Sequence, residues 1–327
     1  MDLTDNTLRK TLDYWEVGAP RAVWTPETGT INTNLIIDAA EGRFVLRRYH
    51  HQDRDRIVQE HALVLWAHER GIPTVPPLRT KAGGTCLEQE GRLFALFPFA
   101  PGDQVQRDAL GEGDVTAMGR FLGRLHTILA AYPVEKVRQR PFRFDRDETL
   151  RGIDRLERLI LERTTLEQSD EYALRRLHGR RSWLERKPDT DIQEVQGLTF
   201  QVTHGDYNET NLFFEHGAVV AIIDWDQVYA APRSWEILRT MHLVLGFEIK
   251  PCRMFLEAYR TEAPMGMPEL ERCAGYYSVI RGYSLWLFEA IYEEGNDRVR
   301  RFLRPGPFVP IEKRWSQLRD GLLGSES

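Results

Sequence analysis

Two short polar stretches stand on either side of a predicted β-hairpin, and they constrain the fold of this chain more than any other feature. The first, T-H-G-D-Y-N-E-T-N, covers residues 203–211, and the second, I-I-D-W-D, has Asp224 at its centre. Between them, two apolar arms flank a turn at residues 215–217, which is typical of a hairpin. Folding the hairpin brings Asn211, where the first arm begins, next to Asp224, where the second ends. With Asp206 just before the first arm, we expect three oxygen-bearing side chains to converge on one point.

This set of donors indicates phosphoryl transfer. Carboxylate and amide oxygens suit a hard cation such as Mg²⁺, which binds through a few protein ligands and completes its shell with phosphate oxygens. A carboxylate that the metal does not need can accept the proton of a hydroxyl. The pattern D-x-x-x-x-N, followed by an Asp after a hairpin, is the arrangement of phosphoryl-transfer enzymes. The plainer alternative is that Asp206 and Asn211 cap turns and that Asp224 ends a strand.

The remaining patterns change character near residue 98. Before it, we expect five short antiparallel strands, with one helix inserted after the third. The strands are predicted at residues 21–24, 34–37 and 44–47 and on both sides of residues 88–91, and the helix at residues 53–70. After Pro98–Pro101 the spacing of apolar residues is helical, first over 115–131 and again from residue 267 onward. We therefore predict two parts, residues 1–98 and residues 99–327.

Charge and apolar runs exclude some classes of protein. The formal net charge of −5 argues against a nucleic-acid binder, which would usually be basic. No apolar run reaches the roughly 20 residues that cross a bilayer, so we expect no membrane insertion. The first ten residues lack an apolar signal core, and we expect a cytoplasmic protein. The three cysteines lie far apart and predict neither a metal site nor a disulfide framework. The oligomeric state is left open.

Further motifs surround the two polar stretches. They include F-V-L-R-R-Y at residues 44–49, L-F-P-F-A-P-G at 96–102 and L-G-R-L-H at 122–126. With them, nearly the whole chain resembles the aminoglycoside phosphotransferase and choline kinase superfamily, to which type II homoserine kinases and bacterial stress-response Ser/Thr kinases are similar. The resemblance implies an α+β, bilobal protein-kinase-like fold. Residues 1–98 would form a small five-stranded antiparallel nucleotide-binding lobe, and residues 99–327 a larger, mainly helical lobe with the catalytic loop and the acceptor site.

The resemblance also implies roles for the central residues. Asp206 matches the catalytic Asp, which orients and deprotonates the acceptor hydroxyl. Asn211 and Asp224 match the two metal ligands. His204 matches the histidine of the loop, and we expect it to brace the loop. Asp226 is an additional carboxylate that either supports the site or faces solvent.

In the first part, the resemblance requires a cation on the third strand. Arg47 stands where the family has a phosphate-holding Lys, and its guanidinium is a planar fork where Lys is a point charge. The effect of this exchange on the rate is left open. Glu60 is the expected helix carboxylate partner, although a simple surface ion pair is the alternative. Gly29 and Thr30 lie in the expected phosphate-covering loop, which has a single glycine.

The strand that ends at residue 99 matches the hinge that contacts the nucleotide base. Phe97, Pro98 and Phe99 occupy it, and because backbone groups would read the base, the sequence does not distinguish ATP from GTP.

We therefore expect a phosphotransferase that uses ATP and Mg²⁺ and carries the γ-phosphoryl group to a hydroxyl of a small molecule. Two alternatives stay open: a Ser/Thr protein kinase of the bacterial stress-kinase type, and a nucleotide-binding regulatory pseudokinase. The acceptor itself is not determined. An aromatic cage for choline would use Tyr276, Tyr283 and Trp286, which could equally form a packed core stripe. A homoserine-like acceptor would need a cation for its carboxylate, for which Arg281 is available.

Overall fold

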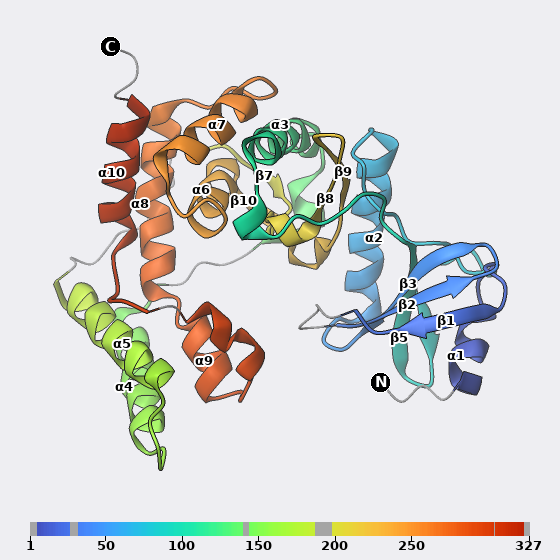
Figure 1. The fold of residues 1–327 in the computed structure, drawn as a ribbon, viewed down its shortest axis with the longest axis horizontal. Helices are drawn as coiled ribbons and strands as arrows, with labels where there is room; N and C mark the ends of the chain where they lie inside the picture. The colour runs from blue at the N-terminus through green and yellow to red at the C-terminus, as the bar shows by residue number, and fades with distance from the viewer. Residues whose placement is uncertain (1–4, 27–31, 140–143, 187–197, 304, 324–327) are drawn as a thin grey trace. The chain divides into compact units, whose positions relative to one another are not determined.

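The computed structural model describes residues 5–26, 32–139, 144–186, 198–303 and 305–323. Its contacts divide the chain into two compact units. Unit 1 comprises Met1–Gln139, Gln201–Ala231 and Met254–Pro264, and unit 2 comprises Arg140–Phe200, Pro232–Arg253 and Met265–Ser327. The architecture is α+β, as expected, and combines a five-stranded antiparallel sheet with many helices (Figure 1). The division into residues 1–98 and 99–327 stays a prediction.

The antiparallel sheet of unit 1 has the strand count and the helix insertion that the sequence predicts. Its strands are β1 (Pro20–Trp24), β2 (Thr33–Ala39), β3 (Gly42–Tyr49), β4 (Leu87–Gln89) and β5 (Arg92–Pro98). They follow the order β1-β2-β3-β5-β4, and each neighbouring pair is antiparallel. The helix α2 (Arg54–Glu69) lies between β3 and β4 in the chain, and the side chain of Asp53 caps its first turn by accepting from the Arg56 N–H.

The two faces of this sheet differ because side chains alternate along a strand. One face is buried in an apolar cluster that includes Ile37, Leu46 and Leu96. The short helix α1 (Asp5–Leu12), which the sequence reading missed, covers this face with Leu8 and contributes to the same cluster. The opposite face is only partly buried, and it is the face on which Arg47 lies.

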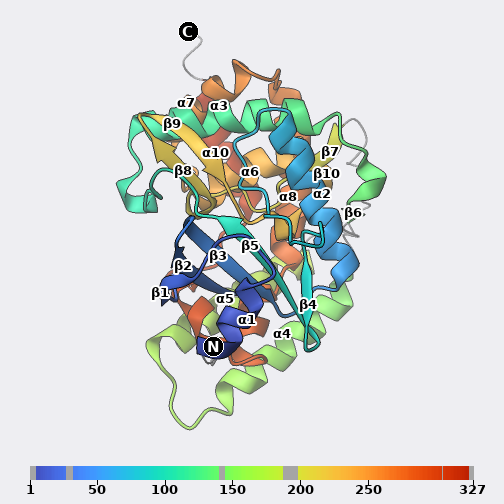
Figure 2. The same ribbon diagram turned by 90° about the vertical axis from the view of Figure 1, so that its right-hand side faces the viewer.

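The β-hairpin between the two polar motifs forms as predicted. Its arms are β8 (Leu212–Glu215) and β9 (Ala218–Ile222), which pair antiparallel (Figure 2). Each arm is fastened to a segment from the first part of the chain. The N–H and C=O of Asp103 bond to Phe214 in β8, and the N–H of Ile222 in β9 donates to the Pro73 carbonyl at 2.9 Å. These bonds hold the hairpin in unit 1 at both of its strands.

Unit 1 is completed by a helix and a small sheet. The helix α3 (Glu112–Leu129) appears where its apolar stripe predicts it. At Gly119 the helix approaches another backbone so closely that a Cβ would lie 2.2 Å from the Phe255 carbonyl oxygen. The small sheet consists of β6 (Arg138–Gln139), β10 (Tyr229–Pro232) and β7 (Phe200–Thr203), in that order.

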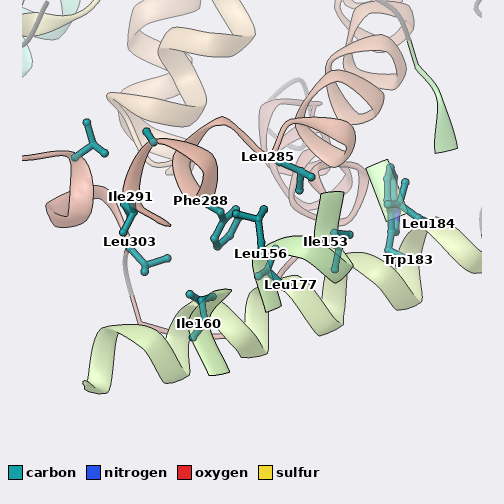
Figure 3. Close-up of a cluster of buried hydrophobic side chains, with 13 residues drawn as sticks. Ile153, Leu156, Ile160, Leu177, Trp183, Leu184, Leu285, Phe288, Ile291 and Leu303 are labelled. Atoms are coloured by element: carbon teal, nitrogen blue, oxygen red, sulfur yellow. The ribbon is translucent and has the colours of Figure 1, made fainter. Parts of the chain in front are cut away.

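Unit 2 is predominantly helical. Its helices are α4 (Arg146–Leu161), α5 (Gln168–Arg186), α6 (Arg233–Leu243), α8 (Met267–Tyr283), α9 (Trp286–Tyr292) and α10 (Ile311–Leu323), while α7 (Ile249–Arg260) belongs to both units. The charged helices α4 and α5 bury one apolar stripe each, and Leu156 and Leu177 meet Phe288 of α9 in one cluster (Figure 3). Across the residues that the structure describes, no helix combines the length and apolarity needed to span a bilayer.

Candidate active site

The loop after β7 is held against the segment that follows the hairpin. The Thr203 hydroxyl donates to the Tyr229 carbonyl at 3.0 Å. Gly205 has a φ of +82°, and a Cβ there would lie 1.9 Å from the Gln227 carbonyl oxygen. Only glycine combines this left-handed conformation with so close an approach. The G in H-G-D is therefore required by the packing of the loop.

His204 braces this loop from a fully buried position. Its Nε2 donates to the Ile223 carbonyl at 3.0 Å, and its Nδ1 accepts from the Asp206 N–H at 3.3 Å. The ring packs edge-on against Trp225, with ring centroids 4.8 Å apart. Because one nitrogen donates and the other accepts, the imidazole is neutral and joins the loop to the residue preceding Asp224. This geometry suits the bracing role expected for His204 better than a role in proton transfer.

Asp206 and Asn211 are in direct contact. The Asn211 Nδ2 donates to the Asp206 Oδ2 at 3.0 Å and to the Asp206 carbonyl at 2.9 Å. These bonds leave the Asn211 Oδ1 as the amide atom that can serve a cation. The Asn211 carbonyl accepts from the Ile223 N–H at 3.0 Å, which brings Asp224 to the same end of the hairpin. The structure thus brings together the three residues that the sequence predicts to converge.

Asp224 has an unusual backbone conformation, with φ 66° and ψ 61°. This left-handed region is uncommon for residues other than glycine and tends to occur at functional sites. The Asp224 carboxylate is 35% exposed, and its Oδ1 lies 3.1 Å from the Arg47 Nη1. An ion pair therefore joins the end of the hairpin to the five-stranded sheet within unit 1.

Three residues contact the Arg47 side chain: Asp224, Asn34 and Phe97. Its side chain is 13% exposed, its Nε donates to the Asn34 Oδ1 at 3.2 Å, and its guanidinium lies 5.7 Å from the Phe97 ring centroid. Burial, the largest influence, lowers the pKa of Arg47, but the anionic groups around it, with Asp224 first among them, together outweigh burial, and the net pKa lies above its usual value. Arg47 is therefore a fixed cation at the site.

The expected pairing of Arg47 with Glu60 is not formed in this structure, where Arg47 pairs with Asp224. Glu60 lies close enough for the charge of Arg47 to act on it, but burial dominates and raises the pKa of Glu60 to about 8. A carboxyl group with that pKa is mostly protonated at neutral pH and offers little charge. The Asp224 carboxylate, with its Oδ1 3.1 Å from the Arg47 Nη1, is the partner that forms the ion pair.

Asp226 is buried, so of the two alternatives for this residue the solvent-facing one is wrong. Burial, with the negative charge of Asp224 in second place, raises the pKa of Asp226 to about 6. Its backbone carbonyl accepts from Arg56 and Arg138 at 3.2 and 3.3 Å. Asp226 therefore supports the segment around Asp224.

The partly buried face of the sheet offers an apolar platform beside Arg47. Cross-strand register places Ile36, Val45 and Phe97 in line, with all three side chains partly buried. Ile36 and Val45 were not predicted as site residues, although the period-2 spacing of Val45 and Arg47 in β3 could have indicated the shared face. A flat apolar surface next to a cation suits a nucleotide base with its phosphates.

The expected hinge residues lie where β5 ends. Pro98 is its last residue, and Phe99 follows with 38% of its side chain exposed. The Phe99 N–H donates to the Arg43 carbonyl at 2.9 Å, and Pro98 has no N–H. Neither residue can donate a backbone hydrogen bond to a base in this arrangement. The Arg43 guanidinium lies over the rings of Trp24 and Phe99, at 5.4 and 5.3 Å from their centroids.

The two residues expected in the phosphate-covering loop, Gly29 and Thr30, lie outside the described residues.

An ion pair between a buried glutamate of the loop and a partly exposed arginine was also missed. Glu209 is 2% exposed, and its Oε1 accepts from the Arg107 Nε and Nη2, both at 2.8 Å. Its other oxygen, Oε2, is buried without a hydrogen-bond partner. A glutamate between two polar residues of the motif was a signal that could have prompted a search for a cation. The pair fastens the 3₁₀ turn Glu209–Asn211 to the segment after β5.

The donors at this end of the hairpin limit which metal the site can hold. Within the described ranges, no group of three or more His, Cys, Asp or Glu side chains could hold a metal ion. Asn211 and Asp224 offer an amide and a carboxylate oxygen at adjoining positions, and both are hard donors. Mg²⁺ commonly uses one or two protein ligands together with phosphate oxygens. The donors therefore fit Mg²⁺ bound together with a nucleotide, and they do not form a metal site made of protein alone.

The family model described as the phosphotransferase enzyme family matches residues 25–276. The chain belongs to this family. It is accordingly a transferase, a kinase whose acceptor carries an alcohol group.

Three distant relatives match over nearly their whole length. The chain is 23% identical to a homoserine kinase of Caulobacter vibrioides (strain NA1000 / CB15N), over 98% of each chain. Its fold is similar to a spectinomycin phosphotransferase in complex with ADP and spectinomycin, with a TM-score of 0.65, 13% identity and coverage of 100% of this chain and 96% of that one. It is also similar to an amicoumacin kinase in complex with AMP-PNP and Ca²⁺, with a TM-score of 0.58, 17% identity and coverage of 96% and 97%. These structural likenesses establish the protein-kinase-like fold.

Proposed function

We propose that this kinase uses ATP and Mg²⁺ to phosphorylate a hydroxyl group of a small amino or hydroxy acid. One observation carries the proposal: Asp206, Asn211 and Asp224 lie at one end of the hairpin, and Asp224 pairs with Arg47 from the sheet at 3.1 Å. Under this proposal, the arrangement would supply a base, two oxygen donors for a cation and a phosphate-binding cation within unit 1.

Asp206 is the proposed base. As the acceptor oxygen forms its bond to the γ-phosphorus, the bond between that phosphorus and the β–γ bridging oxygen breaks, and Asp206 takes the hydroxyl proton. Asn211 holds the Asp206 carboxylate through its Oδ2, which fixes its direction. His204 fixes the Asp206 backbone from the other side. Because both the side chain and the backbone of Asp206 are fixed, the base is already oriented for proton transfer, which lowers the entropic cost of reaching the transition state.

Asn211 and Asp224 would hold Mg²⁺, which, when bound, neutralises charge on the phosphate oxygens. Arg47 would contact the phosphates from the sheet. Its present partner, Asp224, shows that the guanidinium reaches the hairpin end. Because charge spreads over the phosphoryl oxygens in the transition state, a fixed cation there stabilises the transition state more than the ground state.

Two observations support the proposed class of acceptor. One is the similarity to a homoserine kinase, and the other is a positively charged side chain in unit 2. A cage for a quaternary ammonium group is not supported, since Tyr276 is buried while Trp286 is 56% exposed. The cation Arg281 lies on the same helix, two residues before Tyr283, and would repel an ammonium group. An acceptor with a carboxylate is the better match.

The test is ATP turnover with Mg²⁺ in the presence of amino alcohols, hydroxy acids, sugars and a protein substrate. We expect a small hydroxy acid to stimulate turnover. Asp206→Asn should lower the rate by about 10²–10⁴-fold, the range of general base catalysis. The matched control, Asp55→Asn at an exposed position of α2, should retain wild-type turnover.

Binding of ATP by Asp206→Asn, measured from the rise in unfolding temperature, should be retained. Undiminished turnover in Asp206→Asn would show that another residue takes the proton of the acceptor hydroxyl. Turnover stimulated only by a protein substrate would favour the stress-kinase alternative, and nucleotide binding without turnover would favour the pseudokinase.

A further inference from the structure

A buried arginine of unit 2 lacks a carboxylate partner. Arg180 of α5 is only 9% exposed, and its Nη1 donates to the carbonyl of Ser284. Its Nε is buried and has no hydrogen-bond partner. Among the described residues, Arg180 makes no ion pair. Burying a guanidinium without a counter-charge is costly, so this position calls for an anion.

Aromatic rings provide the immediate surroundings of this guanidinium. The Cζ of Arg180 lies 5.2 Å from the ring centroid of Phe308 and 5.5 Å from that of Phe288. The faces of aromatic rings attract cations, which explains how Arg180 is tolerated beside the apolar cluster of unit 2. Rings do not replace an acceptor for the free Nε–H.

A second arginine lies beside the first. Arg281 of α8 precedes Ser284, whose carbonyl accepts from Arg180, by three residues, and its charge acts on Arg180. Arg281 is partly buried, and within the described part of the chain it makes no hydrogen bond or ion pair. Burial, followed by the charges of Arg281 and Arg176, lowers the pKa of Arg180 to about 9. The positive charges of Arg180 and Arg281 therefore repel each other, and among the described residues neither side chain forms an ion pair with a carboxylate.

One acid that reaches α8, at Ser278, is already engaged. Glu312 of α10 accepts from the Trp183 Nε1 at 2.6 Å and from the Ser278 hydroxyl, so both of its oxygens have donors. The positive potential also extends to His242, which is neutral because burial, with Arg281 first among the nearby cations, lowers its pKa to about 2. The positive charge of Arg281 therefore acts on both Arg180 and His242.

We propose that Arg180 and Arg281 form a binding site for the carboxylate group of a small acid. The Arg281 guanidinium, which is partly exposed, would make the first contact, and the free Nε–H of Arg180 would supply a second donor. Two guanidinium groups match the two oxygens of a carboxylate. The inference goes beyond the proposed function, because binding of a carboxylate within unit 2 does not depend on phosphoryl transfer.

The test measures binding to the full chain by calorimetry at low salt and without nucleotide. The probes are L-homoserine, L-2-aminobutyrate, which lacks the side-chain hydroxyl, and the diol in which CH₂OH replaces the carboxylate of homoserine. We expect both acids to bind and the diol not to bind. Arg281→Met should weaken binding of the acids by about tenfold or more, the value of a hydrogen bond to a charged group. The control Arg175→Met removes an exposed arginine from the same helix as Arg180 and should bind like wild type.

Arg180→Met is the second variant. It should lose carboxylate binding while its unfolding temperature without ligand stays at or above that of the wild type, because an uncompensated buried charge has been removed. Equal affinities for the diol and for homoserine, or equal affinities of Arg281→Met and Arg175→Met, would overturn the proposal. Because no nucleotide is present, a chain that binds both acids yet transfers no phosphoryl group would retain this site and refute only the proposed function.

Discussion

Replacing Gly205 by alanine tests whether the packing of the catalytic loop governs the site. Two costs combine at this position. An L-residue in a left-handed conformation costs about 1–2 kcal/mol, and Gly205 has a φ of +82°. In addition, the new Cβ would lie 1.9 Å from the Gln227 carbonyl oxygen, where ordinary contact begins at 3.4 Å. Forcing such an overlap into packed structure typically costs about 1–3 kcal/mol more.

Gly217, in the hairpin turn, supplies a matched control. Its φ is +76°, and nothing lies within 4 Å of an added Cβ. Gly217→Ala therefore incurs the backbone cost alone, about 1–2 kcal/mol. We expect Gly205→Ala to be destabilised by about 1–3 kcal/mol beyond Gly217→Ala. The assay compares urea unfolding of the two variants, followed by ATP turnover.

The effect on turnover should be larger than the effect on stability. Relief of the overlap requires the loop or the Gln227 segment to move, and either motion displaces Asp206 from Asp224. Gly205→Ala should therefore lose most of its turnover, whereas Gly217→Ala should retain it. If both variants unfold at the same urea concentration and turn over ATP equally, the close approach does not control the site.

Four further variants test the charges of the site. Because burial raises the pKa of Glu60 from 4.5 to about 8, the folded chain holds a proton that the unfolded chain releases, and unfolding free energy should fall as pH rises through this range. Glu60→Gln should remove that fall, at most about 5 kcal/mol, when urea unfolding is compared at pH 5 and pH 8. Arg47→Ala should cut turnover strongly and Arg47→Lys should keep part of it, because the charge survives; wild-type turnover in Arg47→Ala would show that another cation holds the phosphates. Arg107→Met leaves Glu209 buried and unpaired, and it should destabilise the chain by about 3–5 kcal/mol, measured by urea unfolding; a change below about 1 kcal/mol would show that the pair is weak.

Local sequence determined the features that depend on neighbouring residues. The hairpin forms where two apolar arms flank Glu215–Gly217, because its strands pair across a short turn. The joint placement of Asn211 and Asp224 follows from that pairing. The five strands and the inserted helix were also predictable, because the spacing of apolar residues within a short segment indicates a strand or a helix. The likeness of the two polar motifs to a kinase family agrees with the family match over residues 25–276.

Only the tertiary structure decided which charges meet. Arg47 pairs with Asp224, a residue far along the chain, while the carboxylate expected from the sequence, Glu60, has a raised pKa because of burial. Likewise, no local pattern indicated that Arg107 would bond to Glu209 or that Arg180 would be buried without an acid. The strength of a charge and the identity of its partner depend on desolvation and on distances set by packing across the whole fold. The spacing of apolar residues along the chain predicts neither the strength of a charge nor the identity of its partner.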